Sequence, residues 1–154
     1  METNINTTDF TIPNADALTN VLHEHGQYKL TDLVTKLTDV AGKKSFLVFK
    51  HNKYFAVAVK NIAFFHIRFE SSLIVCMDGK EYPVNYSLDQ IQHLVTGKQF
   101  FRVNRQSLVN FSAINEVEHY FARKLLINLS IATTEKLLVP KEKVRSFLYW
   151  MENR

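Results

Sequence analysis

The chain has 154 residues, of which 46% are apolar and 22% are charged, a composition typical of a folded globular protein. Its single cysteine excludes a disulfide framework and a thiolate zinc site, and it favours a reducing compartment. No apolar run approaches the ~20 residues of a membrane-spanning helix and the N-terminus lacks a secretory signal, so we expect a cytoplasmic protein with no membrane partner.

The formal net charge of +4 is distributed unevenly along the chain. Residues 1–43 contain three Lys and six Asp or Glu, whereas residues 44–154 contain 16 Lys or Arg and nine Asp or Glu. A basic domain behind an acidic leader indicates a polyanionic partner. Many small basic proteins bind no nucleic acid, however, so charge alone leaves both interpretations open.

Residues 1–43 predict a polar tail followed by two short helices. Residues 1–10 show no periodicity, one helix can begin after Pro13 and end at Gly26, and a second ends at Gly42. The second helix has one apolar stripe, which must be covered by the following domain, by a second copy or by a domain absent from this sequence. That stripe consists of Leu30, Leu33, Val34, Leu37, Val40 and Ala41.

From Ser45 the apolar period changes from helical to extended, and short strands are expected at 46–49, 54–59, 62–65, 72–77 and 80–86. The first two are separated by a hairpin loop at residues 51–53. Asp78-Gly79 predicts a second hairpin with both turn residues at positive φ. Pro83 cannot donate to a ladder, so its strand should lie at an edge. Strand 72–77 is apolar on both faces, which predicts cover on both sides and a packed Cys76.

The rest of the chain predicts two helices and further strands. Ser87 and Gln90 fit a capping box for a helix that ends near Gly97. Residues 100–103 are extended, and residues 124–130 and 136–139 predict a hairpin. Pro140 can begin a C-terminal helix, whose expected apolar stripe is Val144, Phe147, Leu148 and Met151. The expected domain is mainly β, with one internal and one C-terminal helix.

No residue pattern indicates catalysis or a cofactor. The six histidines are scattered without a carboxylate or thiol partner at metal-ligand spacing, so we expect no metal site. Glycines at 26, 42, 79 and 97 cannot form a phosphate-binding loop. Glu116 and Glu118 share a strand face but lack a catalytic neighbour. The sequence therefore predicts a protein that is not an enzyme.

The most informative segment is FFRVNRQSLVN at residues 100–110, which mixes apolar residues with Arg, Asn, Gln and Ser. Arginine forks match guanine edges or phosphates, and Asn or Gln amides match adenine edges. The alternative is a strand and turn in which Arg102 and Arg105 are solvated or paired to Glu116 and Glu118. Residue chemistry alone leaves these two interpretations balanced.

This segment resembles the signature of LytTR-type DNA-binding domains, Phe-x-Arg-Val/Ile-His-Arg-Ser-Tyr/Phe-Leu-Val-Asn. The hairpin around Asp78-Gly79, the helix at 87–94, the segment at 114–117 and residues 139–144 fall where that family has corresponding elements. The resemblance covers residues 44–152 and implies an elongated β-β-β fold, here preceded by a short helical N-terminal segment. Such domains commonly follow a receiver domain in bacterial two-component response regulators and bind direct repeats in promoters.

The resemblance also implies DNA-contacting residues. Arg105 and Lys141 occupy family contact positions, with Arg102 and Asn104 beside the first. Near the second, Lys143 and Arg145 can reach phosphates, and the loop before Ser72, with Arg68, Glu70 and Ser71, corresponds to a third contact. The sequence departs from the family pattern at three places: Asn104 replaces the usual His, Gln106-Ser107 replaces Ser and an aromatic, and Pro140-Lys141 stands where Ser-Arg is common. Lys cannot reproduce a bidentate Arg contact, so the departure at Lys141 affects base choice but not phosphate attraction.

Two functions follow from these patterns. The first is a sequence-specific transcriptional regulator that binds double-stranded DNA, with homodimerisation through the N-terminal helices or on DNA. The second is a protein-interaction module that keeps the fold but has lost DNA binding, consistent with the substituted signature and acidic leader. Residues 1–43 are too short for a receiver domain. We therefore expect either a stand-alone regulator or a chain that retains only an interdomain linker before the domain at 44–154.

Overall fold

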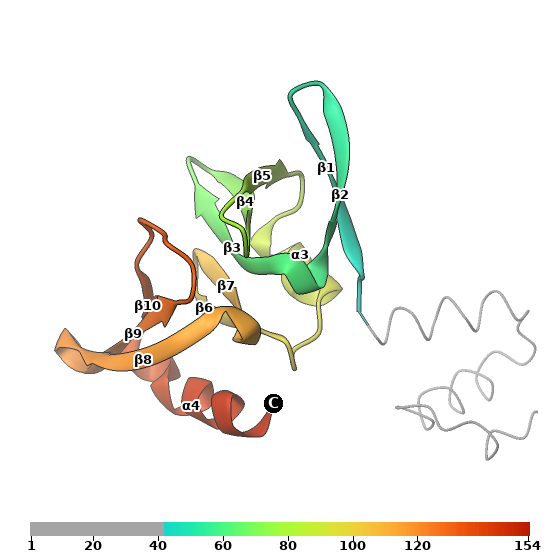
Figure 1. Ribbon diagram of the computed structural model, residues 1–154. Coiled ribbons are helices and arrows are strands. Elements are labelled where there is room, and N and C mark those ends of the chain that lie inside the picture. Colours follow the sequence, from blue (N-terminus) through green and yellow to red (C-terminus); the bar gives the residue numbers. More distant parts are fainter. Residues whose placement is uncertain (1–41) are drawn as a thin grey trace, which may run out of the picture. The chain divides into compact units, whose positions relative to one another are not determined.

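The computed structural model describes residues 42–154, and the two expected N-terminal helices with the stripe from Leu30 to Ala41 lie outside the described residues. Over residues 42–154 the chain forms three antiparallel sheets and two α-helices (Figure 1). None of the helices in this range is long and apolar enough to cross a membrane. The mainly β class and the two helices expected from the sequence are confirmed.

The sheets follow one another along the chain. The first pairs β1 (Ser45–Lys50) with β2 (Lys53–Ala58). The second has the order β5-β4-β3-β7-β6, and the third has the order β10-β9-β8. The strands of the second and third sheets are β3 (Ile62–Arg68), β4 (Ser71–Cys76), β5 (Glu81–Val84), β6 (Phe100–Asn104), β7 (Ser107–Asn110), β8 (Ile114–Tyr120), β9 (Lys124–Leu129) and β10 (Leu137–Val139).

The central sheet lies between two apolar clusters because its strands are apolar on both faces. Phe65 and Ile74 belong to the cluster that also contains residues of the β1–β2 hairpin and of α3 (Leu88–Leu94). Their chain neighbours Phe64 and Val75 belong to the second cluster, with residues of β9, β10 and α4 (Val144–Asn153). This alternation follows from the two-residue period of a strand, and it confirms the cover expected on both faces of β4.

Cys76 lies in the first cluster with 6% of its surface exposed. Burial, with a smaller contribution from the negative charge of Asp78, raises the pKa of its thiol to about 11. The thiol therefore stays protonated at neutral pH. Cys76 is a packed small hydrophobe, as its strand pattern indicated.

The turns explain most of the strand boundaries. His51 and Asn52 have φ of 53° and 63°, which gives the two-residue hairpin that matches the strand twist. The expectation for Asp78-Gly79 was wrong in its turn type. Gly79 has φ of 86° and donates to the carbonyl of Cys76, while the Cys76 amide donates to the carbonyl of Lys80. This is a longer loop that needs a left-handed residue at Gly79 alone.

Two local expectations concern edges and caps. Pro83 lies in β5, which is an edge strand, so its missing N–H costs the sheet nothing. Ser87 caps α3 by accepting from the Gln90 amide at 3.1 Å, and the Gln90 side chain accepts from the Ser87 amide at 2.9 Å. Both predictions are confirmed, although α3 ends at Leu94 rather than at Gly97.

The expected apolar stripe of the C-terminal helix needs one correction. Phe147 is fully buried as expected, but Leu148 is half exposed and Trp150 is buried in its place. Trp150 packs against the Phe101 ring in a tilted arrangement and against the Phe111 ring edge to face, and it donates its indole N–H to the carbonyl of Gly97 at 2.7 Å. A wide indole with a polar tip is favoured where the helix meets both apolar rings and a carbonyl.

Candidate nucleic-acid interface

The turn between β6 and β7 carries the segment that the sequence singled out. It consists of Arg105 and Gln106, both exposed, between Asn104 and Ser107. Gln106 also connects this turn to the neighbouring hairpin, because its carbonyl accepts from the Ile67 amide at 2.9 Å. The turn therefore presents the Arg105 side chain to solvent from a backbone fixed to the central sheet.

Arg102 holds the backbone of this turn in place. Its guanidinium donates to the carbonyls of Asn104 at 2.7 Å and Arg105 at 2.9 Å. It also donates to the side chains of Asp89 at 2.8 Å and Gln92 at 3.1 Å on α3. With four donated bonds and a side chain only 16% exposed, Arg102 connects α3 to the turn, and it is not paired to Glu116 or Glu118. Those two carboxylates accept from Asn128 instead.

Asn104 and Lys143 connect the turn to the second predicted contact segment. The Asn104 amide donates to the carbonyl of Leu138 in β10 at 2.9 Å, and its Oδ1 accepts from the Gln106 amide. Lys143 closes a short 3₁₀ helix, η5 (Lys141–Lys143), and its ammonium donates to the carbonyl of Arg102 at 3.0 Å. Burial and then the neighbouring Arg102 charge lower the pKa of Lys143. These bonds hold β10 and the end of η5 against β6 and the β6–β7 turn.

A groove of about 570 Å³ lies between the turn and η5. Arg105, Lys136 and Lys143 bring three positive charges to its lining, against one negative charge from Glu142. Lys141 follows the lining residue Pro140 directly and is exposed, and Arg145 is exposed on the first turn of α4. A groove lined by cations and amides, with few carboxylates, is suited to a phosphate backbone.

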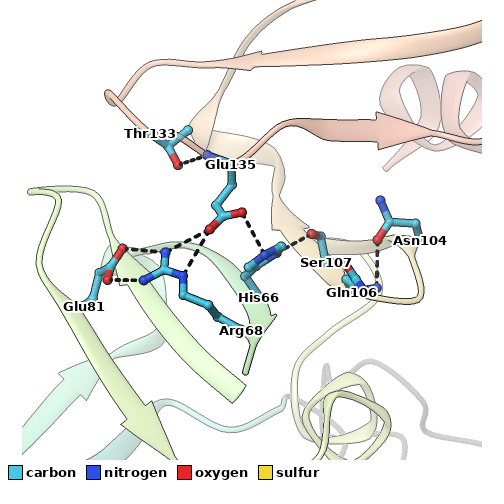
Figure 2. Close-up of polar contacts among 8 residues, drawn as sticks. All are labelled: His66, Arg68, Glu81, Asn104, Gln106, Ser107, Thr133 and Glu135. Carbon is cyan, nitrogen blue, oxygen red and sulfur yellow. Dashed lines mark hydrogen bonds and ion pairs between the residues drawn. The ribbon is translucent and has the colours of Figure 1, made fainter. Parts of the chain in front are cut away.

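A second polar cluster ties the β3–β4 hairpin to the segment before β10 (Figure 2). The Arg68 guanidinium donates to both carboxylate oxygens of Glu81, at 3.0 and 3.2 Å, and to Glu135 at 2.9 and 3.1 Å. The bond to Arg68 lowers the pKa of Glu81, and the two carboxylates raise the pKa of Arg68. Arg68 supplies one positive charge for the two carboxylates of Glu81 and Glu135, so it offsets only one of their two negative charges.

His66 is the buried member of this cluster. Its Nε2 donates to Glu135 at 3.0 Å, and its Nδ1 accepts from the Ser107 hydroxyl at 2.9 Å. Burial has the largest effect and, together with the Arg68 charge, lowers the pKa of His66 despite the opposing effects of Glu135 and Glu81. The neutral imidazole therefore joins β3, β7 and the β9–β10 connection at one point (Figure 2).

The β3–β4 hairpin, which carries His66 and Arg68, ends in an unusual turn. Phe69 and Glu70 have φ of 50° and 62°, and Phe69 is 93% exposed. An aromatic residue is strained at positive φ, where glycine or asparagine is favoured. Ser71, a predicted contact, is exposed at the start of β4 and pairs with Arg68 in the ladder. The tip of this hairpin thus presents the Phe69 ring and the Ser71 hydroxyl to solvent.

The structure brings most of the predicted site residues to one region. Asn104, Arg105 and Lys143 line the groove, with Lys141 beside them, whereas the Arg102 and Asn104 side chains are committed to internal bonds. Sequence reasoning missed Lys136, which lines the groove, and the cluster of His66 with Glu135. Only the histidine gave a signal, since it interrupts an apolar strand. The described part of the chain holds no group of three or more His, Cys, Asp or Glu side chains able to bind a metal ion.

The described residues thus form a β domain of three antiparallel sheets and two α-helices, with a groove lined by cations and amides. The family profile of the LytTr DNA-binding domain matches residues 52–152. The chain belongs to this family, which consists of DNA-binding domains and not of enzymes.

A solved structure from Bacillus cereus, the LytTr DNA-binding domain of a methyl-accepting/DNA response regulator, has the same fold with a TM-score of 0.64. The two chains share 15% identity, and the match covers 71% of this chain and 98% of the other. At this identity the likeness establishes the fold alone. A comparison with curated proteins gives no match to this chain.

Proposed function

We propose that the chain is a sequence-specific transcriptional regulator that binds direct repeats in bacterial promoters as the output part of a two-component system. The observation that carries this proposal is the exposed Arg105 on a turn whose carbonyls are held by Arg102. A side chain on a fixed backbone can form a bidentate pair with guanine without ordering the loop first. Lys141, Lys136 and Arg145 supply exposed cations nearby for phosphates.

We assign a role to each site residue from what its side chain contacts. Arg105 reads a base edge, Lys141 and Arg145 contact phosphates, and Ser71 adds a contact from the β3–β4 hairpin. Arg102 and Lys143 position the two contact segments, because their polar groups are bonded to backbone carbonyls. Phosphate contacts then supply affinity and the few base contacts supply specificity.

Selection of bound duplexes from a random pool tests both binding and site choice. On the selected operator, Arg105→Ala should cost ~1–3 kcal/mol, and it should cost much less on random duplex. Lys141→Ala should weaken both DNAs similarly and flatten the salt slope by about one unit. Operator preference that survives Arg105→Ala would contradict the role of this residue, and failure to select any duplex would contradict the function.

One observation favours the alternative, a protein-interaction module without DNA binding. Asn104 stands where the family has a His, and its amide is bonded to Leu138 and Gln106 rather than directed to solvent. The Asn104 side chain is therefore not available as a base contact. The discriminating measurement is the binding of random duplex at two salt concentrations, since a protein with several phosphate contacts must bind more weakly as salt rises.

A further inference from the structure

Within residues 42–154, no strand pairs with the outer edge of β2, and the DNA-binding proposal does not use this edge. The two-residue turn makes Lys50 and Lys53 a hydrogen-bonded pair, so Phe55 and Val57 also bond to β1. The bond from the Val59 amide to the Lys44 carbonyl continues the same pattern. The N–H and C=O groups of Tyr54, Ala56 and Ala58 therefore point away from β1. Within residues 42–154, no backbone bond joins these three residues to another segment.

A groove of about 360 Å³ runs along this edge, between β2 and the β4–β5 turn. Its apolar lining includes Phe55, Met77 and Tyr82, and its polar lining includes Asn61, Asp78 and Lys80. The groove therefore combines a row of backbone donors and acceptors with a space for apolar side chains. This is the combination that extended peptides use when they add a strand to a sheet.

The outer face of the same hairpin is also apolar. Leu47, Phe49 and Tyr54 are 67%, 50% and 71% exposed, and the Phe49 and Tyr54 rings contact each other at 4.8 Å between centroids. Proteins normally protect an edge strand with charge, proline or a bulge, and an exposed apolar patch marks an interaction site. In Figure 1 this hairpin extends past the central sheet.

The charge of the hairpin identifies the kind of partner. Residues 43–61 contain five lysines and no Asp or Glu. Lys43 and Lys50 lie over the rings of Phe46 and Tyr82, and Lys44, Lys53 and Lys60 are distributed along the strands and their ends. An added strand would thus lie beside a hairpin that carries only positive charge, with Lys53 on β2 itself, and beside Asp78 and Lys80, whose charges offset each other in the groove. Carboxylates on that strand would be favoured, because opposite charges in neighbouring strands attract.

We propose that the β2 edge binds an extended acidic segment of a partner protein, whose apolar residues alternate with Asp or Glu. The segment adds as a third strand beside β2. Its apolar side chains contact Tyr54 and Leu47 on the outer face or enter the groove beside Phe55 and Met77. This site is separate from the Arg105 groove in the residues that line it, so a regulator on DNA can use it to contact another protein.

The test is selection of peptides from a displayed library of random nine-residue sequences on the full chain. The expected consensus alternates apolar and acidic residues, and the selected peptide should slow hydrogen exchange at the amides of Tyr54, Ala56 and Ala58. Ala56→Pro removes one outward N–H without touching a bond to β1, and it should weaken the peptide about tenfold. Ala56→Ser keeps that N–H and should bind like wild type.

Retained protection of the Phe55 and Val57 amides shows that Ala56→Pro has left the hairpin intact. Four results would overturn the proposal. These are a library that enriches no acidic peptide, equal binding by Ala56→Pro, protection of the three edge amides by duplex DNA, and protection of those amides without any peptide. If protection without peptide does not depend on protein concentration, another part of the same chain covers the edge. If it increases with protein concentration, a second copy covers it.

Discussion

Arg102 shows how a residue within a recognition signature can act at a distance from the nucleic acid. The sequence places it two positions from Asn104 and three from Arg105, which is compatible with a DNA contact or with a structural pairing inside the sheet. In the structure its guanidinium donates hydrogen bonds to two backbone carbonyls of the turn and to two side chains of α3. Charge-assisted hydrogen bonds from an arginine to backbone carbonyls hold the conformation of the turn.

Arg102→Ala is therefore expected to lower the stability of the fold more than it changes the choice of DNA sequence. Loss of bonds to two carbonyls and a carboxylate should lower the free energy of unfolding by about 1–3 kcal/mol. Arg145→Ala is the matched control, because Arg145 is exposed on α4. Urea unfolding of the two variants measures the difference. Equal stabilities would show that Arg102 does not support the turn.

His66 predicts a dependence of stability on pH. Its pKa in the folded protein is lowered below 6.5 by burial and by Arg68, against the opposing charges of Glu135 and Glu81. As pH falls through 6.5, the unfolded chain takes up a proton that the folded chain still excludes. The free energy of unfolding should then decrease by up to about 1.4 kcal/mol per pH unit until the folded-state pKa is reached.

The matched variants for this prediction are His66→Gln and His119→Gln, because His119 is exposed. Urea unfolding between pH 5 and 8 should show the slope below pH 6.5 in wild type and in His119→Gln. His66→Gln should be less stable at pH 8 and should lose most of the slope. A slope that survives in His66→Gln would assign the titration to another group.

At the scale of elements, the β3–β4 hairpin combines strain with exposure. A phenylalanine in the left-handed region costs about 1 kcal/mol, and its ring gains no burial in return. The bond from the Ile67 amide to the Gln106 carbonyl keeps the hairpin beside the Arg105 turn, and the bidentate pair of Arg68 with Glu81 joins it to β5. Strain that persists in a rigid setting indicates a functional reason for the residue.

Phe69→Gly should therefore stabilise the protein and weaken DNA binding together. Relief of the positive φ should raise the free energy of unfolding by up to about 1 kcal/mol. The exposed ring lies two residues before Ser71, the contact proposed for this hairpin, so its loss should lower operator affinity. Ala122→Gly is the control, because Ala122 also has positive φ, at 59°, but lies in the β8–β9 turn. Unchanged operator affinity in Phe69→Gly would exclude the hairpin tip from the interface.

The elements that the sequence predicted well are those determined by near neighbours. The capping box of α3, the β1–β2 turn and the two apolar faces of β4 depend on residues within a few positions of one another. The cluster of His66 with Glu135 could not be predicted, because these residues are far apart in sequence and meet only through the sheet order. Leu148 and Trp150 were misassigned because residues on neighbouring elements decide which of them is buried.

At the scale of the whole molecule, the two predicted DNA-contact segments come from different sheets. The Arg105 turn belongs to the central sheet, and η5 follows the last strand of the third sheet. Asn104 and Lys143 join them across this boundary with bonds of 2.9 and 3.0 Å. The signature indicated candidate contact residues, but the relative position of the two segments depends on packing of the second apolar cluster.

The last prediction concerns the apolar stripe of the leader, which the sequence alone supports. Four aliphatic residues at helical spacing, Leu30, Leu33, Leu37 and Val40, would form an unusual patch if solvent reached them all. Leu33→Lys with Leu37→Lys should lower either the oligomer mass in light scattering or the thermal stability. Thr35→Lys with Thr38→Lys, on the polar side of the same segment, is the matched control. A fall in mass identifies a second copy as the partner of the stripe, and a fall in melting temperature alone identifies cover within one chain. If neither quantity changes relative to the control, the stripe is not an interface.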